Sequence, residues 1–322
     1  MSLIKSTYKP PFLFKNAHFN TIYKTLFYKK KITYQRKRIL TPDADFLDLD
    51  FSTVGSNTLV IAMHGLEGSS QSSYILSAIA YLNNNKIDCV ALNFRGCSGE
   101  DNNHLQSYNS GKTDDLQTTI DYILEHYSYK NILLLGYSMG GNITLKYLGE
   151  TKIIASEIKG AIAISVPCDL KGSSYTLATW KNSIYMNRFL KTLKKKTVLK
   201  INKFPKNNID KEVVLKAKSF EDFDNAVTAP LFGYKNAEDY WDKCSCKQFI
   251  PSITTPTLLI NALDDSFLSE SCYPIEEAKN HSYFKLEMPK YGGHVGFNTS
   301  IFGKDLFWSE KRVLKAIHHF IS

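Results

Sequence analysis

The sequence predicts an α/β fold in which a mostly parallel central sheet is covered by helices on both faces. Short apolar runs alternate with amphipathic segments from about residue 45 onward. The runs are apolar throughout, as strands buried on both faces are. The chain shows no internal repeat, and its 322 residues suffice for one large α/β domain, so we expect a single domain over 1–322.

The expected elements follow in order from these patterns. Strands are predicted at 46–51, 58–63, 87–94, 132–135, 160–166, 257–261 and 283–288. Helices are predicted at 73–82 and 308–321. Two further helices are predicted from their apolar positions, one that includes 116–127 and one that includes 143–148. In the first of these two, Leu116, Ile120 and Ile123 recur on one face behind Thr113 or Asp114, either of which can act as the N-cap.

The alternation of strands and helices breaks between residues 168 and 250. This stretch has no comparable strand and instead shows Lys-rich helical segments and scattered aromatic residues. We therefore expect 168–250 to be a mainly helical cap insertion within the single domain. In one of its helices an apolar face is formed by Tyr185, Met186, Phe189, Leu190 and Leu193. Lysines fall mainly outside that face, at Lys191, Lys194, Lys195 and Lys196.

The net charge of +9 is concentrated in one part of the chain. Residues 171–218 hold 13 Lys or Arg against Asp210 and Glu212, so this segment carries +11 and the rest −2. A basic amphipathic helix of this kind could close over a substrate pocket and present its lysines to an anionic membrane. A solvated Lys-rich helix explains the same pattern. Because no recognisable nucleic-acid motif accompanies the lysines, we expect no nucleic-acid partner.

The composition excludes several classes of protein. Hydrophobic residues make up 43% and charged residues 22%, which is the balance of a globular protein rather than a disordered or membrane-spanning one. The first residues lack a secretion signal, and six cysteines in so long a chain do not suggest a disulfide framework. We therefore expect a cytoplasmic protein that is at most peripheral to a membrane.

A Gly-x-Ser-x-Gly pentapeptide provides the candidate nucleophile. Residues 136–140 read Gly-Tyr-Ser-Met-Gly, directly after the apolar run 132–135 and before a predicted helix. This strand-turn-helix context is that of a nucleophile elbow, in which a tight turn exposes the serine hydroxyl above the sheet. Ser138 is therefore the candidate nucleophile, and the glycines make room for the turn.

A serine hydroxyl needs a base and a group that orients the base. Asp264 and Asp265 follow the predicted strand 257–261, and His294 follows the strand 283–288. All lie at the carboxyl ends of strands, where ligands bind in open α/β sheets. The residue pattern alone leaves the choice between Asp264 and Asp265 open.

The strand 58–63 leads into His64-Gly-Leu-Glu-Gly68, where such folds place an oxyanion-hole donor. We expect the backbone N–H groups of Leu66 and Met139 to form the oxyanion hole. Glu67 is a candidate for tuning the site, and His64 is expected to support the turn.

Taken together, these segments resemble the α/β-hydrolases, and within them the YheT-like branch that includes eukaryotic medium-chain esterases and phospholipases. The matching segments are 15–23, 64–70, 93–100, 110–115, 136–142, 145–150, 223–231, 264–267 and 292–297. The resemblance implies Ser138 as nucleophile, His294 as base and Asp265 as the orienting acid. The chain departs from the branch pattern at Asn109, where members often have His, and at Ser266, where they often have Pro.

The expected activity is that of a serine hydrolase cleaving carboxylic esters with short- to medium-chain acyl groups or lipid-like esters, with a role in lipid metabolism. Its partner would be a small-molecule ester, and we expect no metal and no organic cofactor. Transfer of the acyl group to an alcohol is an alternative for the same three residues. A second alternative is a non-catalytic, lipid-binding protein that kept the fold.

Overall fold

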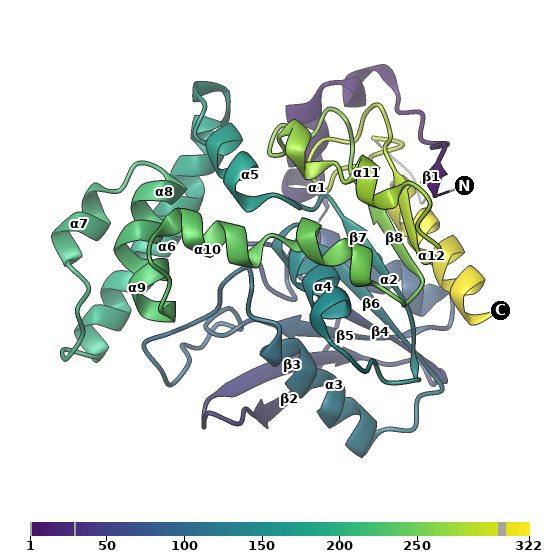
Figure 1. The fold of residues 1–322 in the computed structure, drawn as a ribbon. Helices are drawn as coiled ribbons and strands as arrows, with labels where there is room; N and C mark the ends of the chain where they lie inside the picture. Colours follow the sequence, from purple (N-terminus) through teal and green to yellow (C-terminus); the bar gives the residue numbers. More distant parts are fainter. Residues whose placement is uncertain (1, 29, 302–306) are drawn as a thin grey trace.

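A computed structural model describes residues 2–28, 30–301 and 307–322 (Figure 1). One sheet of nine strands has the order β1-β9-β8-β7-β6-β4-β5-β3-β2. The strands are β1 (Leu3–Ile4), β2 (Gln35–Leu40), β3 (Phe46–Ser52), β4 (Thr58–Met63), β5 (Asp88–Asn93), β6 (Asn131–Tyr137), β7 (Ile158–Ile164), β8 (Thr257–Ile260) and β9 (Phe284–Glu287). Apart from β3, which is antiparallel to both of its neighbours, adjacent strands pair in parallel. The predicted mostly parallel sheet is confirmed.

Helices cover both faces of the sheet. These are α1 (Ala17–Phe27), α2 (Ser73–Asn84), α3 (Asp114–His126), α4 (Met139–Glu150) and α12 (Trp308–Ile321). Alternate side chains of β4 point to opposite faces of the sheet. Leu59, Ile61 and Met63 pack in the apolar cluster with α3 and α4. Val60 and Ala62 pack in the cluster with α2 and α12. Period-two alternation thus builds two cores from one apolar strand.

Strand β2 lies outside the predicted elements because it is charged rather than apolar. Arg36 and Arg38 of β2 pair with Asp50 and Asp48 of β3, with N–O distances of 2.7 and 2.8 Å. Since β2 forms the sheet edge, its charged side chains discourage the addition of another strand. Apolar periodicity cannot detect a strand held by ion pairs.

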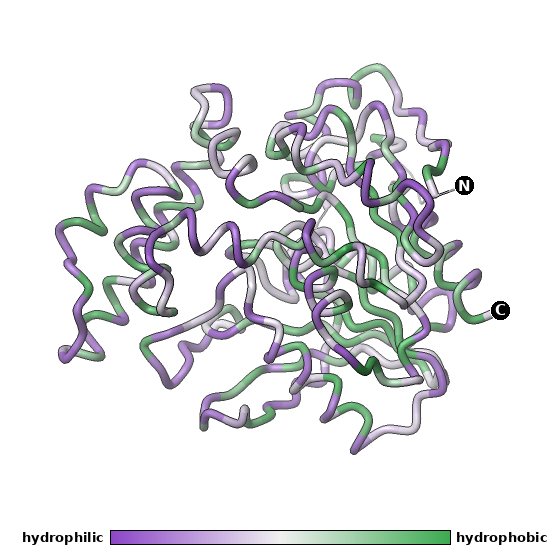
Figure 2. The backbone as a smooth tube through the Cα atoms, viewed as in Figure 1, coloured by the Kyte–Doolittle hydropathy of each residue, from purple (hydrophilic) through white to green (hydrophobic). Residues whose placement is uncertain are grey.

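Between β7 and β8 the chain forms helices and no strand. They are α5 (Leu170–Leu177), α6 (Ser183–Lys203), α7 (Lys211–Lys216), α8 (Phe220–Phe223), α9 (Ala229–Phe232) and α10 (Ala237–Cys244), with a π-helical turn at Asp224–Thr228. Their own apolar cluster includes Met186, Leu190, Val214, Phe223 and Val227. Figure 2 shows hydrophobic strands in the sheet, whereas the lobe of α6 to α9 alternates between hydrophilic and hydrophobic residues. No helix among the described residues is long and apolar enough to span a membrane.

Candidate active site

Ser138 occupies the sharp turn between β6 and α4. Its backbone has φ 53° and ψ −119°, a conformation that residues other than glycine rarely adopt. Two close approaches of the backbone make this turn depend on glycine: a Cβ at Gly136 would lie 2.4 Å from the Gly140 oxygen, and one at Gly140 would lie 2.6 Å from the Met63 oxygen. The strained turn raises the Ser138 hydroxyl above the carboxyl end of the sheet.

The structure brings His294 and Asp265 to Ser138. His294 Nε2 lies 3.0 Å from Ser138 Oγ, and His294 Nδ1 lies 2.9 Å from Asp265 Oδ2. With the imidazole proton on Nδ1, Nε2 is free to accept the serine proton. Both His294 and Asp265 are buried, so this chain of hydrogen bonds is shielded from bulk water.

Two contacts that the sequence patterns missed hold the imidazole in place. Thr21 Oγ1, on α1, accepts a 2.8 Å hydrogen bond from the His294 backbone N–H. The Phe267 ring stacks on the His294 ring with a centroid distance of 4.1 Å. Thr21 and Phe267 both lie in segments matched by the family resemblance. The spacing of residues along the sequence does not predict that either of them contacts His294.

Asp264 lies beside these residues and contacts the loop that carries His294. Its Oδ1 accepts a 2.9 Å hydrogen bond from the Gly293 N–H, while its Oδ2 is buried without a hydrogen-bond partner among the described residues. Burial raises the pKa of the Asp264 carboxyl to about 6. Asp264 thus supports the loop, whereas Asp265 touches the imidazole.

The turn after β4 lies close to Ser138. A Cβ at Gly65 would lie 3.1 Å from the Ser138 Cβ, which shows how closely this turn approaches the serine. Within the described chain, neither the Leu66 N–H nor the Met139 N–H donates to another backbone or side-chain group. Met139 also opens helix α4, whose first N–H groups carry partial positive charge. Both groups are available to a developing oxyanion.

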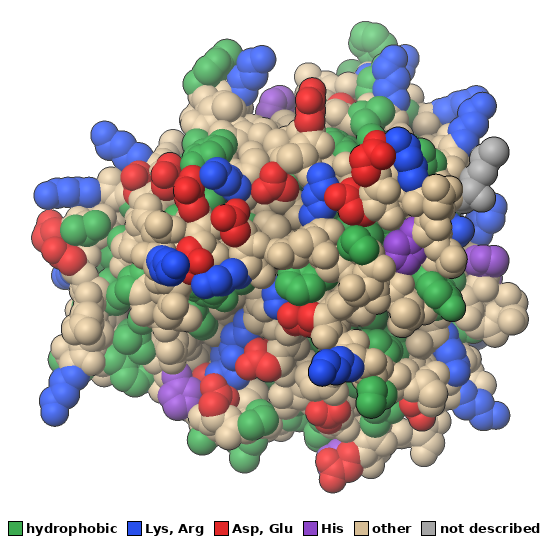
Figure 3. Space-filling view, viewed as in Figure 1, with side chains coloured by type: hydrophobic (Ala, Val, Ile, Leu, Met, Phe, Trp, Pro, Cys, Tyr) green, Lys and Arg blue, Asp and Glu red, His purple; other side chains and the backbone are tan. Residues whose placement is uncertain are grey.

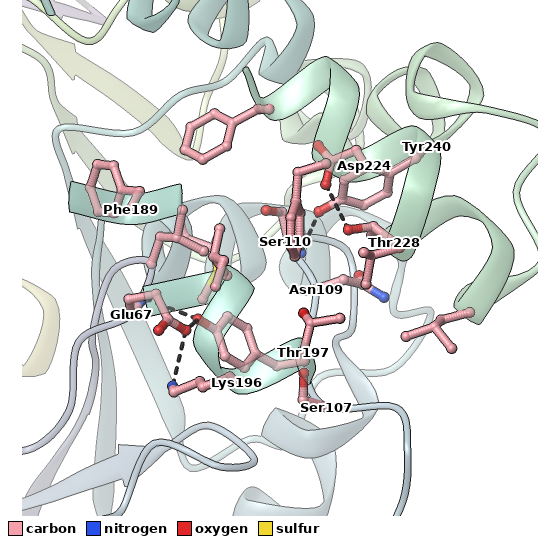
Figure 4. A pocket seen from close by; sticks show the side chains of 18 of the residues that line it. Glu67, Ser107, Asn109, Ser110, Phe189, Lys196, Thr197, Asp224, Thr228 and Tyr240 are labelled. Atoms are coloured by element: carbon pink, nitrogen blue, oxygen red, sulfur yellow. Dashed lines mark hydrogen bonds and ion pairs between the residues drawn. The ribbon is translucent and has the colours of Figure 1, made fainter. Parts of the chain in front are cut away.

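Glu67 links this turn to the helical insertion. Its backbone has φ 55°, and its N–H donates to the Tyr108 hydroxyl at 3.0 Å. The Tyr108 hydroxyl donates to Glu67 Oε1 at 2.6 Å, and Lys196 of α6 donates to the same oxygen at 3.0 Å (Figure 4). Among the lysines expected mainly outside the apolar face of this helix, Lys196 is the one that pairs with Glu67. The paired carboxylate of Glu67 turns this lysine toward the site.

A cavity of about 170 Å³ runs from Ser138 and His294 into the insertion. Apolar residues of the insertion line much of it: Leu170, Leu177, Phe189, Leu193, Ile201, Ile209, Phe220, Phe223, Val227, Leu231, Phe232 and Trp241. Two lysines in its wall are paired with carboxylates, Lys196 with Glu67 and Lys200 with Asp101. Such a cavity suits an uncharged, apolar chain.

Asp224 is a buried carboxylate in the wall of this cavity, and it accepts a hydrogen bond from Thr228 (Figure 4). It also accepts a hydrogen bond from Trp241 Nε1. Burial raises its pKa from 3.8 to about 6. The folded protein therefore binds this proton more tightly than the unfolded chain does, which adds stability below about pH 4 and loses it as pH rises toward 6.

We expect Asp224→Asn to flatten the decline in stability between pH 4 and pH 7. The difference from wild type should reach at most about 3 kcal/mol in the free energy of unfolding, measured by urea denaturation at several pH values. Asp242→Asn, a change at an exposed carboxylate of α10 in the same insertion, is the control. Parallel pH profiles for wild type and Asp224→Asn would contradict the assignment.

Other polar residues near the site have structural partners. His64 Nε2 accepts from the Phe94 N–H at 3.2 Å and its Nδ1 lies 2.7 Å from the Gly65 oxygen, while burial lowers its pKa to about 4. His64 is therefore neutral and holds the turn. Arg95 pairs with Asp43 and Asp115 at 2.6 and 2.7 Å, so it connects the loop between β2 and β3 to the start of α3 and is no free cation in the cavity wall.

Comparison with known proteins adds to this geometry. Residues 58–297 match the model of a family described as the alpha/beta hydrolase fold. The chain is 29% identical to YheT of Escherichia coli over 93% of this chain and 89% of YheT. It is 31% identical to phospholipase ABHD3 of Homo sapiens over 88% of this chain and 71% of that protein. A monoacylglycerol lipase of Saccharomyces cerevisiae is 31% identical over 82% of this chain and 59% of the lipase.

Solved structures share the fold. The esterase Pf2001 of Pyrococcus furiosus superposes with a TM-score of 0.59 at 17% sequence identity, covering 90% of this chain and 93% of that one. At this identity the likeness concerns the fold alone. It agrees with the sheet and the flanking helices described above.

Proposed function

Because the chain belongs to the α/β-hydrolase family, in its YheT-like branch, we propose that this carboxylic ester hydrolase works through Ser138, His294 and Asp265. One observation carries the proposal: Ser138 Oγ, the His294 ring and the Asp265 carboxylate form a continuous line of contacts of 3.0 and 2.9 Å. A serine, a base and an orienting acid in this arrangement are the requirements of acyl transfer through a covalent intermediate.

In the proposed mechanism, Ser138 Oγ attacks the ester carbonyl carbon while His294 Nε2 takes its proton. Asp265 holds the imidazole and stabilises the imidazolium cation. The negative charge on the former carbonyl oxygen is stabilised by the N–H groups of Leu66 and Met139. His294 then protonates the leaving alcohol, and a water molecule activated in the same way releases the acid and frees Ser138.

The substrate that fits best is an ester with an uncharged acyl chain of short to medium length or a lipid-like ester. The apolar cavity between the insertion and Ser138 would hold the chain, so we propose that 168–250 acts as the cap of a single domain over 1–322. The phospholipase and monoacylglycerol lipase among the relatives act on lipids, according to their names, which supports this substrate class.

A fluorophosphonate probe tests the proposed nucleophile directly. We expect the intact protein to react at one position, and peptide mass spectrometry to locate the adduct on Ser138, because this hydroxyl alone has His294 as a base. Turnover of p-nitrophenyl esters of increasing chain length then measures the depth of the acyl pocket. An adduct on another serine, or turnover without any adduct, would contradict the assignment.

The contact between Glu67 and Lys196 suggests that α6 steadies the oxyanion turn. We expect Lys196→Met to lower kcat for p-nitrophenyl acetate by about 3- to 10-fold with little change in KM, because Leu66 is next to the residue that loses its ion pair. Lys195→Met, at an exposed lysine one position earlier, should leave kcat unchanged.

A double variant separates this effect from a general loss of stability. If Lys196 acts through Glu67, adding Glu67→Gln to Lys196→Met should cost less than the product of the two single effects. Fully multiplicative losses would show that the two residues act independently.

A further inference from the structure

Exposed apolar side chains lie on two segments that touch, the N-terminal segment and the helical insertion. Phe12 and Leu13 are 83% and 51% exposed, and Trp180 and Ile184 are 80% and 79% exposed. The two pairs come from segments that touch: His18 of α1 stacks on Tyr185 of α6, and their polar atoms lie 3.2 Å apart. We call the surface formed by 12–18 and 180–199 the basic apolar face.

The charge of this face has one sign. Neither residues 1–42 nor residues 170–209 contain any Asp or Glu, while each segment contains ten Lys or Arg. On α6, the exposed residues Ile184, Arg188, Lys191, Lys195 and Leu199 follow one another at spacings of three or four, so they form one stripe. No ion pair joins Arg188, Lys191 or Lys195 to a carboxylate of the described chain.

Figure 3 shows the same combination on the surface. Along the upper edge, hydrophobic side chains lie next to Lys or Arg side chains both over the N-terminal segment and over the arch that follows α5. Large exposed apolar groups are costly in water unless something covers them. Here the covering partner must also accept positive charge.

The basic apolar face lies close to the proposed active site. Four rings contact one another in series from the His294 imidazole to this face: His294 stacks on Phe267 at 4.1 Å, Phe267 meets Tyr185 edge-to-face at 4.7 Å, and Tyr185 stacks on His18 at 5.7 Å. A surface that covers the face is therefore separated from His294 by a short row of aromatic side chains.

We propose that the basic apolar face docks on an anionic lipid surface. Phe12, Leu13, Trp180 and Ile184 enter the interfacial layer, and Arg188, Lys191 and Lys195 lie among the anionic headgroups. Self-association through this face is disfavoured, because two copies would bring like charges together. Nucleic acid would match the charge but not the aliphatic side chains of Leu13 and Ile184. Delivery of a lipid ester from this surface rests on the proposed function, whereas docking itself does not.

Vesicle sedimentation tests the charge contribution, using vesicles of phosphatidylglycerol and phosphatidylcholine against vesicles of phosphatidylcholine alone. We expect preference for the anionic vesicles, weakened by salt. The triple variant Arg188→Glu/Lys191→Glu/Lys195→Glu should bind about 10²-fold more weakly. The matched control is Lys86→Glu/Lys130→Glu/Lys152→Glu, which makes the same charge change at exposed lysines near the amino ends of the strands. Equal losses in the two triple variants would overturn the proposal, because they would reflect net charge alone.

Tryptophan quenching tests the insertion of the apolar residues. Brominated phosphatidylcholine within the anionic vesicles should quench the fluorescence of wild type, and Trp180→Phe should abolish most of this quenching while retaining binding. Phe12→Ser/Ile184→Ser should weaken binding, whereas Ile153→Ser, at a side chain 86% exposed elsewhere, should not. Quenching that is unchanged in Trp180→Phe would overturn the proposed orientation. RNA binding that competes with the vesicles and depends on the same residues would overturn the choice of partner.

The tests distinguish docking from catalysis. Ser138→Ala should bind vesicles as wild type does, since Ser138 is no part of the face. The face variants should hydrolyse the water-soluble p-nitrophenyl acetate at the wild-type rate. Loss of vesicle binding with intact hydrolysis would therefore contradict docking alone. Loss of hydrolysis with intact vesicle binding would contradict the proposed function alone.

Discussion

Ser138→Ala is expected to reduce kcat for p-nitrophenyl butyrate by about 10⁶-fold, to near the background rate. The variant keeps the strained turn and the N–H groups of Leu66 and Met139, but it has no oxygen for His294 to activate. Without that oxygen no acyl-enzyme forms, and the remaining polar groups can only assist direct attack by water. Initial rates at saturating ester, corrected for spontaneous hydrolysis, measure the effect.

A matched control shows whether the loss belongs to this one hydroxyl. Ser174→Ala removes another serine hydroxyl from the wall of the same cavity and should retain most of the activity. Both variants should unfold at the wild-type temperature, since a small polar group is removed from the edge of a cavity. Comparable losses in Ser138→Ala and Ser174→Ala would argue for a general change in the pocket rather than for a nucleophile.

Apolar patterns along the chain anticipated the central strands because burial on both faces selects apolar residues there. The strand at 58–63 and the helix at 308–321 were predicted with the boundaries of β4 and α12. For the helix that includes 143–148 the apolar positions gave no first residue, and in the structure α4 begins at Met139. Its first turn is rich in glycine and polar residues, which the apolar period does not register.

Ser138, His294 and the pair Asp264 and Asp265 were predicted because each follows a strand that ends at the same edge of the sheet, whereas the preference for Asp265 came from the family resemblance. Their supports were not found, because those supports come from contacts between distant segments. Thr21 reaches His294 across 273 positions, and Lys196 reaches Glu67 across 129. The direction of Lys196 depends on how α6 packs against the turn that carries Glu67, and a helical period alone does not give that contact.

The choice between Asp264 and Asp265 is the sharpest structural question for the proposed mechanism. Asp265 Oδ2 lies 2.9 Å from His294 Nδ1, whereas Asp264 accepts from the Gly293 backbone. In Asp265→Asn the new amide can donate to the imidazole, which favours the tautomer with its proton on the wrong nitrogen and leaves the imidazolium without a counter-charge. We therefore expect kcat/KM for p-nitrophenyl butyrate to fall by about 10⁴-fold.

Asp264→Asn provides the paired comparison, since it makes the same change one residue away. The asparagine oxygen can still accept from the Gly293 N–H, so the loop carrying His294 should stay in place and activity should fall by less than about 10-fold. Thermal unfolding of both variants serves as the control for folding. A larger loss in Asp264→Asn than in Asp265→Asn, at equal stability, would transfer the orienting role to Asp264, because only direct contact with the imidazole explains a loss of that size.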